Sequence, residues 1–440
     1  MATNPSRLLP LAWIPFFLVP FILPDILPDA ITRNLAALST ALFAAAWMWQ
    51  SQPSANTTRD YYGGLFLLLC LLPGAVLLTT QSAQAPWFVW RQSLYLTAAW
   101  LVYAMLRGEN NRWFSSKNWL LLLALFAHLY LIYALIEAFH LQFFRGGNGL
   151  FLFWSNKTAH FPGPLRQQNQ QALFLVFTII PLWRYALASR QQLWWELATI
   201  LPIAGVFLTA SRSGLIVLIL AALLIWILTK FEKGCLITLS RTLILGAILS
   251  WGIASIAPDQ TDNSMLEHIL AAVTEDTPSI RIMLWNIGLH LWLEQPWLGI
   301  GWGNLAAHLV NGAIPVLSAH PEFAPIAASL AGGVTNIHNI ILQFLLEGGV
   351  AAGLALLLLF SALSHRAWTW WRNPPPQQSE QVSGWICAVV ILTHGMVSVA
   401  IMEPFFMVLL AISLAVCFAD DHEAPEAIFE QNAASYPYAK

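Results

Sequence analysis

The chain has 440 residues, of which 58% are hydrophobic and only 10% are charged, and it contains 22 tryptophans. Because a soluble domain carries about 25% charged residues, this composition excludes a string of ordinary soluble domains and indicates an integral membrane protein. The formal net charge of -2 gives no basis for a nucleic-acid partner. The four cysteines lie in apolar runs without paired spacing, which predicts neither a disulfide framework nor a zinc site.

Apolar segments near the length of about 20 residues that crosses a bilayer recur from the N-terminus to residue 418. The first has no A-x-A site, so we interpret it as a retained helix and not as a cleaved signal peptide. The pattern predicts an all-α integral membrane protein, a polytopic bundle of about 12 transmembrane helices within one domain over residues 1–418. The expected spans are 9–24, 31–49, 63–80, 87–106, 119–139, 170–187, 195–210, 213–229, 241–257, 338–363, 383–402 and 404–418.

Lysine and arginine are distributed unevenly between the two sets of loops. The richer set includes Arg107, Lys117 and Arg372 and is expected in the cytoplasm, because positive loops stay inside. Both termini then lie in the cytoplasm, with a loose acidic tail at 419–440. The basic residues expected on the outer face are Arg33, Arg91, Arg145, Lys157, Arg166, Arg212 and Arg281.

Two of the expected outer loops, 140–169 and 258–337, are longer than the 12–15 residues beyond which loops are usually functional or disordered. The second loop is acidic and contains a single arginine. Its "IRIMLWNIGLHLWLEQPWLGIGWGNLAAHL" stretch has the apolar spacing of helices, so we expect amphipathic helices that lie against the membrane.

Arg212 lies in "LTASRSGLIVLIL", a tight turn before an apolar helix, and Arg281 lies in "TPSIRIMLWNIG". Arg212 is either an interfacial arginine that reaches for water or an anion clamp at a helix start, where backbone N–H groups and the guanidinium face one phosphate. Thr277 and Pro278 are typical of a helix start and place Arg281 within the first two turns. A solvated charge and a functional charge both remain open for Arg281.

His338 stands in "GGVTNIHNIILQFLLEGG", at the mouth of an apolar helix. It could cap that helix, bind a phosphate oxygen as a cation, or act as a general base. Glu347, nine residues further on, faces the opposite side of an ideal helix, so the two are not an obvious acid–base dyad. We expect Glu347 to contact a neighbouring helix.

Weaker candidates for supporting roles are polar residues in or beside apolar helices. His394 could be a hydrogen-bonded core histidine, and Glu403, before Pro404, could simply be solvated. No DxD-like pair suggests a divalent metal, so we expect neither a metal nor a cofactor. The supporting candidates are Gln168, Asn169, Asn339, His394 and Glu403.

The order of these segments resembles the O-antigen ligase/polymerase superfamily over roughly residues 155–410. The matching pieces are "PLRQQNQQA", "TASRSG", "RIMLWNIGLHLWLEQPWLGIGWGN", "HNIILQFLLEGGVAAG" and "H…MEP". The Gln-Asn segment and the "PWLGIGWGN" stretch resemble most closely the bacterial protein O-oligosaccharyltransferases (PglL type, including pilin glycosylases), which are related to the WaaL O-antigen ligases. The resemblance implies a GT-C-like fold and carries the family's Arg, Arg and His onto Arg212, Arg281 and His338.

The resemblance also implies an activity in the bacterial inner membrane, with the active site facing the periplasm. A glycan is transferred en bloc from undecaprenyl pyrophosphate to a hydroxyl, either of Ser or Thr in a periplasmic protein such as pilin, or of lipid A-core, or of a growing glycan. Arg212 and Arg281 would bind the pyrophosphate, and His338 would act as the base. The reaction would need no metal and would invert the anomeric carbon.

A transporter or lipid flippase is the main alternative from another class. Transporters place ionisable groups near the middle of the membrane and show inverted repeats. This chain has its notable charges at one expected face and shows no convincing repeat. A purely structural membrane protein would leave the outer-face arginines without a role.

Overall fold

The computed structural model describes residues 61–80, 85–108, 123–135, 165, 167–188, 192–256, 277–327, 330, 334, 336–373, 380–398 and 402–418. Within these ranges every regular element is a helix and none is a strand, in agreement with the all-α expectation. The expected spans at 9–24 and 31–49, most of the 140–169 loop, the first part of the 258–337 loop and the tail at 419–440 lie outside the described residues.

The ten remaining expected spans each overlap a helix. These helices are α3 (Tyr61–Thr80), α4 (Pro86–Gly108), the helix Leu123–Leu135, α6 (Gln168–Ala188), α7 (Gln192–Leu208), α8 (Arg212–Leu228), α9 (Lys233–Ile256), α14 (Ile340–Arg372), α15 (Glu380–His394) and α16 (Pro404–Cys417). The largest differences from the expected spans are that α9 begins at Lys233, α14 extends to Arg372 and α15 ends at His394. Three of the ten helices are long and apolar enough to cross a membrane: Gln168–Leu187, Lys233–Ile253 and Ile340–Arg372. The full count of twelve spans stays a prediction.

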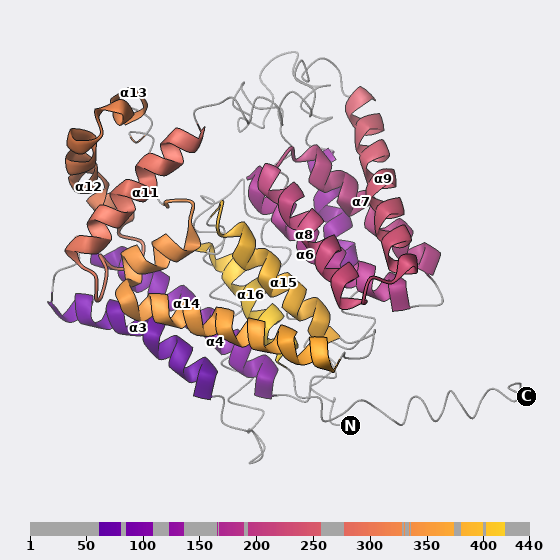
Figure 1. The fold of residues 1–440 in the computed structure, drawn as a ribbon, viewed down its shortest axis with the longest axis horizontal. Helices are drawn as coiled ribbons and strands as arrows, with labels where there is room; N and C mark the ends of the chain where they lie inside the picture. The colour runs from indigo at the N-terminus through magenta and orange to yellow at the C-terminus, as the bar shows by residue number, and fades with distance from the viewer. Residues whose placement is uncertain are drawn as a thin grey trace, which may run out of the picture.

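The expected helices of the second long loop are present between α9 and α14. They are α11 (Thr277–Glu294), α12 (Leu305–Ala319), the short 3₁₀ helix η3 (Pro321–Phe323) and α13 (Ala324–Ala327). In Figure 1 this group lies on the left, α6 to α9 lie on the right, and α14 to α16 run between them. The group has a small core of its own, in which Met283 and Leu309 are buried.

Helices at the centre of the bundle are more buried than helices at its rim. Every side chain of α16 except Leu414 is buried, which agrees with its unbroken apolar sequence "PFFMVLLAISLAVC". Helix α9 instead exposes Ile237, Ile244 and Trp251 on its outer side. An apolar face of this kind is unfavourable in water and suits contact with lipid, so the pattern agrees with a membrane-embedded bundle.

Helix α14 differs from the single continuous span that the sequence predicts. It begins at Ile340, two residues after His338, and is broken at Gly349, which has φ 63° and ψ -164°. At the break, Val350 N–H donates to the Pro296 carbonyl at 2.9 Å. A Cβ on residue 349 would lie 2.2 Å from the Trp297 carbonyl oxygen, so only glycine allows the loop after α11 to pass this close.

The loop that follows α11 fills this break. Ile300 N–H donates to the Leu346 carbonyl at 2.9 Å, and Gly301 N–H donates to the Glu347 carbonyl at 3.0 Å. These bonds satisfy carbonyls that lose their helical partners at the break. The Glu347 side chain is fully buried and faces the backbone of residues 303 and 305, the contact outside its own helix that the sequence predicted. The loop thereby ties α11 to α14.

Candidate active site

Arg212 is the first residue of α8, in the Ser-Arg-Ser-Gly turn that the sequence singled out. Ser211 is the N-cap, and its hydroxyl accepts a hydrogen bond from Gly214 N–H at 3.0 Å. A Cβ on Gly214 would lie 2.4 Å from the Ala172 side chain, so glycine lets α8 approach α6 closely. The Arg212 side chain is exposed. The turn therefore presents a cation beside the N–H groups of a helix N-terminus, an arrangement suited to an anion.

A chain of polar side chains holds this turn against two other helices. The Ser211 hydroxyl donates to Asn169 Oδ1 at 2.7 Å and lies 3.2 Å from the Ser213 hydroxyl. Ser213 Oγ in turn lies 3.0 Å from Nε2 of the fully buried His394. Two of the supporting candidates, Asn169 on α6 and His394 on α15, thus bind the residues on either side of Arg212.

Gln168, the neighbour of Asn169, begins α6 and is half-buried. Its Oε1 atom is buried and has no hydrogen-bond partner among the described residues. One helical turn further on, Gln171 is 1% exposed and neither end of its amide has a partner within the described part of the chain. Gln171 is not among the residues that the sequence predicts for the site.

Arg281 lies in the second turn of α11, which begins at Thr277, and is half-buried. Burial lowers the pKa of its guanidinium, and the charge of Arg212 lowers this pKa further. The positive charge of Arg212, at the start of α8, therefore acts on a guanidinium that α11 provides. An anion bound between the two arginines would relieve their repulsion.

His338 precedes α14 in a left-handed backbone conformation, with φ 53°. Its N–H donates to Asn336 Oδ1 at 3.3 Å. The imidazole is half-buried, and its Nδ1 atom is buried without a hydrogen-bond partner among the described residues. Burial lowers the pKa of His338, and the charge of Arg281 lowers it further. The imidazole is therefore neutral near pH 7, the form that a general base requires.

Asn339, not His338, is the cap of α14. Its Oδ1 accepts hydrogen bonds from Ile341 N–H and Leu342 N–H, both at 3.1 Å. Of the three roles that the sequence left open for His338, capping is therefore taken by its neighbour. A cationic role is disfavoured by the direction of the pKa shift.

Glu403, the last of the supporting candidates, lies at the start of α16. It occupies the N-cap position of α16 without a side-chain cap bond. The charges of Glu403 and of Arg91 on α4 both act on Tyr95. The Glu403 carboxylate therefore lies beside α4. Arg91 itself lies over the Phe88 ring, 4.9 Å from the ring centroid.

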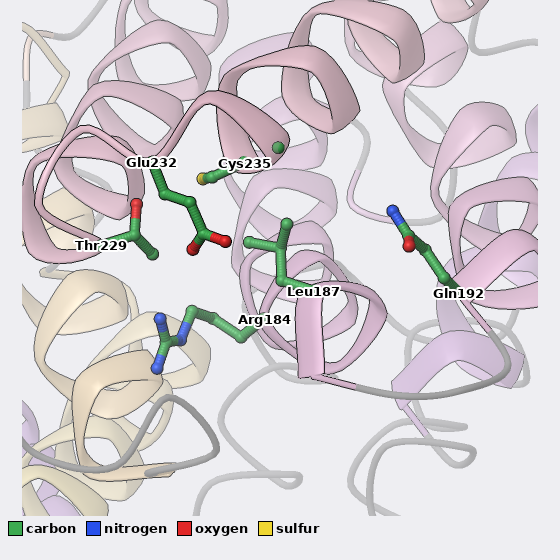
Figure 2. A pocket seen from close by; sticks show the side chains of 7 residues that line it. Arg184, Leu187, Gln192, Thr229, Glu232 and Cys235 are labelled. Carbon is green, nitrogen blue, oxygen red and sulfur yellow. The ribbon is translucent and has the colours of Figure 1, made fainter.

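A small pocket lies at the other ends of the same helices (Figure 2). Its lining includes Arg184 near the end of α6, Thr229 after α8, and Cys235 in the first turn of α9. Helix α8 alone, with 17 residues, is about 25 Å long at a rise of 1.5 Å per residue. The pocket is therefore distant from Arg212, and it does not belong to the candidate site.

Electrostatic interactions thus link Arg281 to both Arg212 and His338, three residues that we call the cluster, and Asn169 and His394 bind the serines beside Arg212. Sequence reasoning missed the roles of Ser211 and Ser213, although a serine before an apolar helix is a recognisable N-cap signal. No local signal could have paired Ser213 with His394, because the two are 181 residues apart.

A family model described as O-antigen ligase matches residues 197–358. The matched segment is less than half of the chain, and it contains all three residues of the cluster. A search of curated proteins found no match to the chain. The similarity supports the O-antigen ligase superfamily and, at this coarse level, a membrane-embedded glycosyltransferase-like ligase or polymerase that uses a lipid-linked glycan donor.

Proposed function

We propose that the protein transfers a glycan en bloc from undecaprenyl pyrophosphate to a hydroxyl group of a periplasmic protein such as pilin. The observation that carries the proposal is the cluster itself: Arg212 begins α8 beside the N–H groups of the helix N-terminus, its charge acts on the half-buried Arg281, and the charge of Arg281 acts on the half-buried His338. A paired cationic site beside a neutral base suits a reaction in which a pyrophosphate leaves and a hydroxyl attacks.

The two arginines bind the pyrophosphate of the donor. As the bond between the anomeric carbon and the pyrophosphate oxygen breaks, the leaving undecaprenyl pyrophosphate takes the electron pair and gains negative charge. Arg212 and Arg281 stabilise this charge without a metal, and their fork-shaped donors can each bind two phosphate oxygens. The expectation of metal independence stays a prediction.

His338 is the general base. Its neutral imidazole takes the proton from the acceptor hydroxyl while the oxygen attacks the anomeric carbon from the side opposite the leaving group. The anomeric configuration is therefore inverted. Because His338 lies in the segment before α14, it can meet a lipid-borne donor and an acceptor that arrives from the periplasmic side.

The second candidate function is ligation of the glycan to lipid A-core, or extension of a growing glycan. The description of the matching family as O-antigen ligase favours this alternative. The chemistry at the cluster is the same, since each acceptor offers a hydroxyl.

The test is transfer by the purified protein from a defined undecaprenyl-pyrophosphate glycan, with His338→Ala beside the wild type. Loss of a positioned base should lower turnover by roughly 10²–10⁴-fold, while donor binding changes little. His290→Ala is the matched control, because His290 lies on α11 and pairs with Glu294 at 3.3 Å. Unchanged turnover in a well-folded His338→Ala protein would remove the histidine from the mechanism.

The acceptor is decided in the same assay by offering pilin and lipid A-core in separate reactions. We expect glycan on pilin, detected as a mass increase of the protein by one or more glycans. Transfer to lipid A-core alone would assign the second candidate function. Transfer to neither, with lengthening of the lipid-linked glycan, would assign a polymerase.

A further inference from the structure

One face of α11 connects Arg281 to the segment that carries His338. Arg281, Trp285 and Gly288 follow one another at spacings of four and three residues, so they lie on the same side of the helix. The Trp285 indole N–H donates to the Ile337 carbonyl at 3.0 Å. A Cβ on Gly288 would lie 3.0 Å from the Ile337 side chain, which shows how closely α11 approaches the residue before His338.

The backbone around His338 is held from several sides. Ile337 N–H donates to Gln343 Oε1 at 2.9 Å, within the first turn of α14, and Ile340 N–H donates to the Gly395 carbonyl at 2.9 Å, just after α15. A non-glycine residue in the left-handed region costs about 1 kcal/mol or more, so such a conformation persists only where its surroundings hold it. The Trp285 bond supplies the connection to α11.

We propose that Trp285 is a positioning residue that sets the placement of His338 relative to Arg281, and that it acts through its hydrogen bond to the Ile337 carbonyl. This inference rests on the proposed function, because it concerns how the general base is placed beside the pyrophosphate site. Trp285 itself contacts neither the donor pyrophosphate nor the acceptor hydroxyl in this proposal.

The bond, and not only the bulk of the ring, is the essential feature. The Trp285 side chain is 37% exposed, so its burial contributes less than that of a core tryptophan. Its N–H meets the carbonyl of the residue that directly precedes the base. Without this bond the Ile337 carbonyl loses a partner from α11, and the His338 backbone can drift away from Arg281.

The first test compares Trp285→Phe with Trp292→Phe in the full-length protein. Trp292 lies on the same helix, and its buried Nε1 has no hydrogen-bond partner among the described residues, so this control removes an indole N–H that holds nothing. Because small misplacements of a catalytic group can lower a rate by up to about 100-fold, we expect roughly tenfold or greater loss of kcat in Trp285→Phe. The KM for the donor should change little, since both arginines remain.

The pH profile gives a readout that a merely structural role would not move. Among the described residues, the charged group that acts on His338 is Arg281 from α11, and Arg212 from α8 acts in turn on Arg281. The groups of α14 and α15 that bind the segment around His338 are uncharged: the Gln343 side chain and the Gly395 backbone. The ring of His394 contacts Ser213. Separating His338 from Arg281 removes a cation that lowers the pKa of His338. The acid limb of kcat should therefore move to higher pH in Trp285→Phe and stay in place in Trp292→Phe.

A second variant approaches the same contact from the other side. Gly288→Ala places a methyl group 3.0 Å from the end of the Ile337 side chain, so both effects should appear in weaker form, while Gly252→Ala on α9 should behave as the wild type, because a Cβ there meets nothing within 4 Å. Wild-type kcat and an unmoved acid limb in Trp285→Phe would overturn the positioning role. If His338→Ala retained full turnover as well as Trp285→Phe, the proposed function itself would fail. If His338→Ala lost turnover while Trp285→Phe kept it, only the positioning role of Trp285 would be wrong.

Discussion

The turn that carries Arg212 and the segment that carries His338 are held in different ways. Around Arg212 a chain of contacts between side chains runs from Asn169 through the two serines to His394, in addition to the cap bond from Gly214 N–H. Around His338 each bond has at least one backbone partner, including those from Trp285 and to Gly395. An arginine has a long side chain that can adjust to a phosphate, whereas a base must lie within hydrogen-bond reach of one proton. The tighter backbone control at His338 agrees with that demand.

The two regions also differ in their exposure to water. Arg212 is exposed, whereas Arg281 and His338 are half-buried. Charges act more strongly on one another where water is excluded. The half-buried pair therefore couples the protonation of the base to the charge of the anion site.

After the loss of His338, the largest expected effect is the loss of either arginine. Arg212→Ala and Arg281→Ala should each lower transfer by roughly 10²–10³-fold, the range for loss of one group that stabilises developing negative charge. Lysine at either position should restore only part of the activity, because it lacks the bidentate fork. Transfer assays on the purified variants measure the effect.

Arg372→Ala is the matched control for these variants. Arg372 is exposed at the far end of α14, over the Trp368 ring, and its loss should leave transfer unchanged. Wild-type rates in both cluster variants would make the arginines interfacial anchors and end the clamp hypothesis.

An intermediate effect should separate the two helix caps. Ser211→Ala and Asn339→Ala each remove a cap worth about 1 kcal/mol. The Ser211 hydroxyl is fully buried and also donates to Asn169, so its loss should lower thermal stability more and should reduce transfer through displacement of Arg212. Thermal unfolding in detergent and transfer rates measure both effects. Equal behaviour of the two variants would show that the side-chain network adds nothing beyond capping.

The smallest expected effect is a displacement of the acid limb in the wild-type protein. A free histidine has a pKa near 6.5, so an ordinary imidazole base would lose half its activity at about pH 6.5. Burial and Arg281 lower the pKa of His338, which keeps the neutral form to lower pH. The midpoint of the limb should therefore lie below 6.5. A rate that increases as the pH falls through this range would instead indicate a cationic role for His338.

Local composition was sufficient to predict where the described helices lie. Apolar segments between turn residues overlap ten helices, because burial of apolar surface or its contact with lipid depends mainly on the residues of each segment. The exceptions arose from distant contacts. Gly349 breaks α14 because the loop after α11 supplies partners for its carbonyls, and α15 ends at His394 where Gly395 binds Ile340.

The candidate site likewise has some features that are encoded locally and others that depend on distant contacts. The sequence by itself predicted the candidate residues: Arg212, Arg281 and His338 each lie at or near the start of a helix within a recognisable motif, and helix starts are encoded locally. Only the tertiary structure decided that the charge of Arg212 acts on Arg281, that the charge of Arg281 acts on His338, and that Trp285 donates to the Ile337 carbonyl. These contacts join residues far apart in the chain, and their partners are selected by helix packing, which local spacing does not encode.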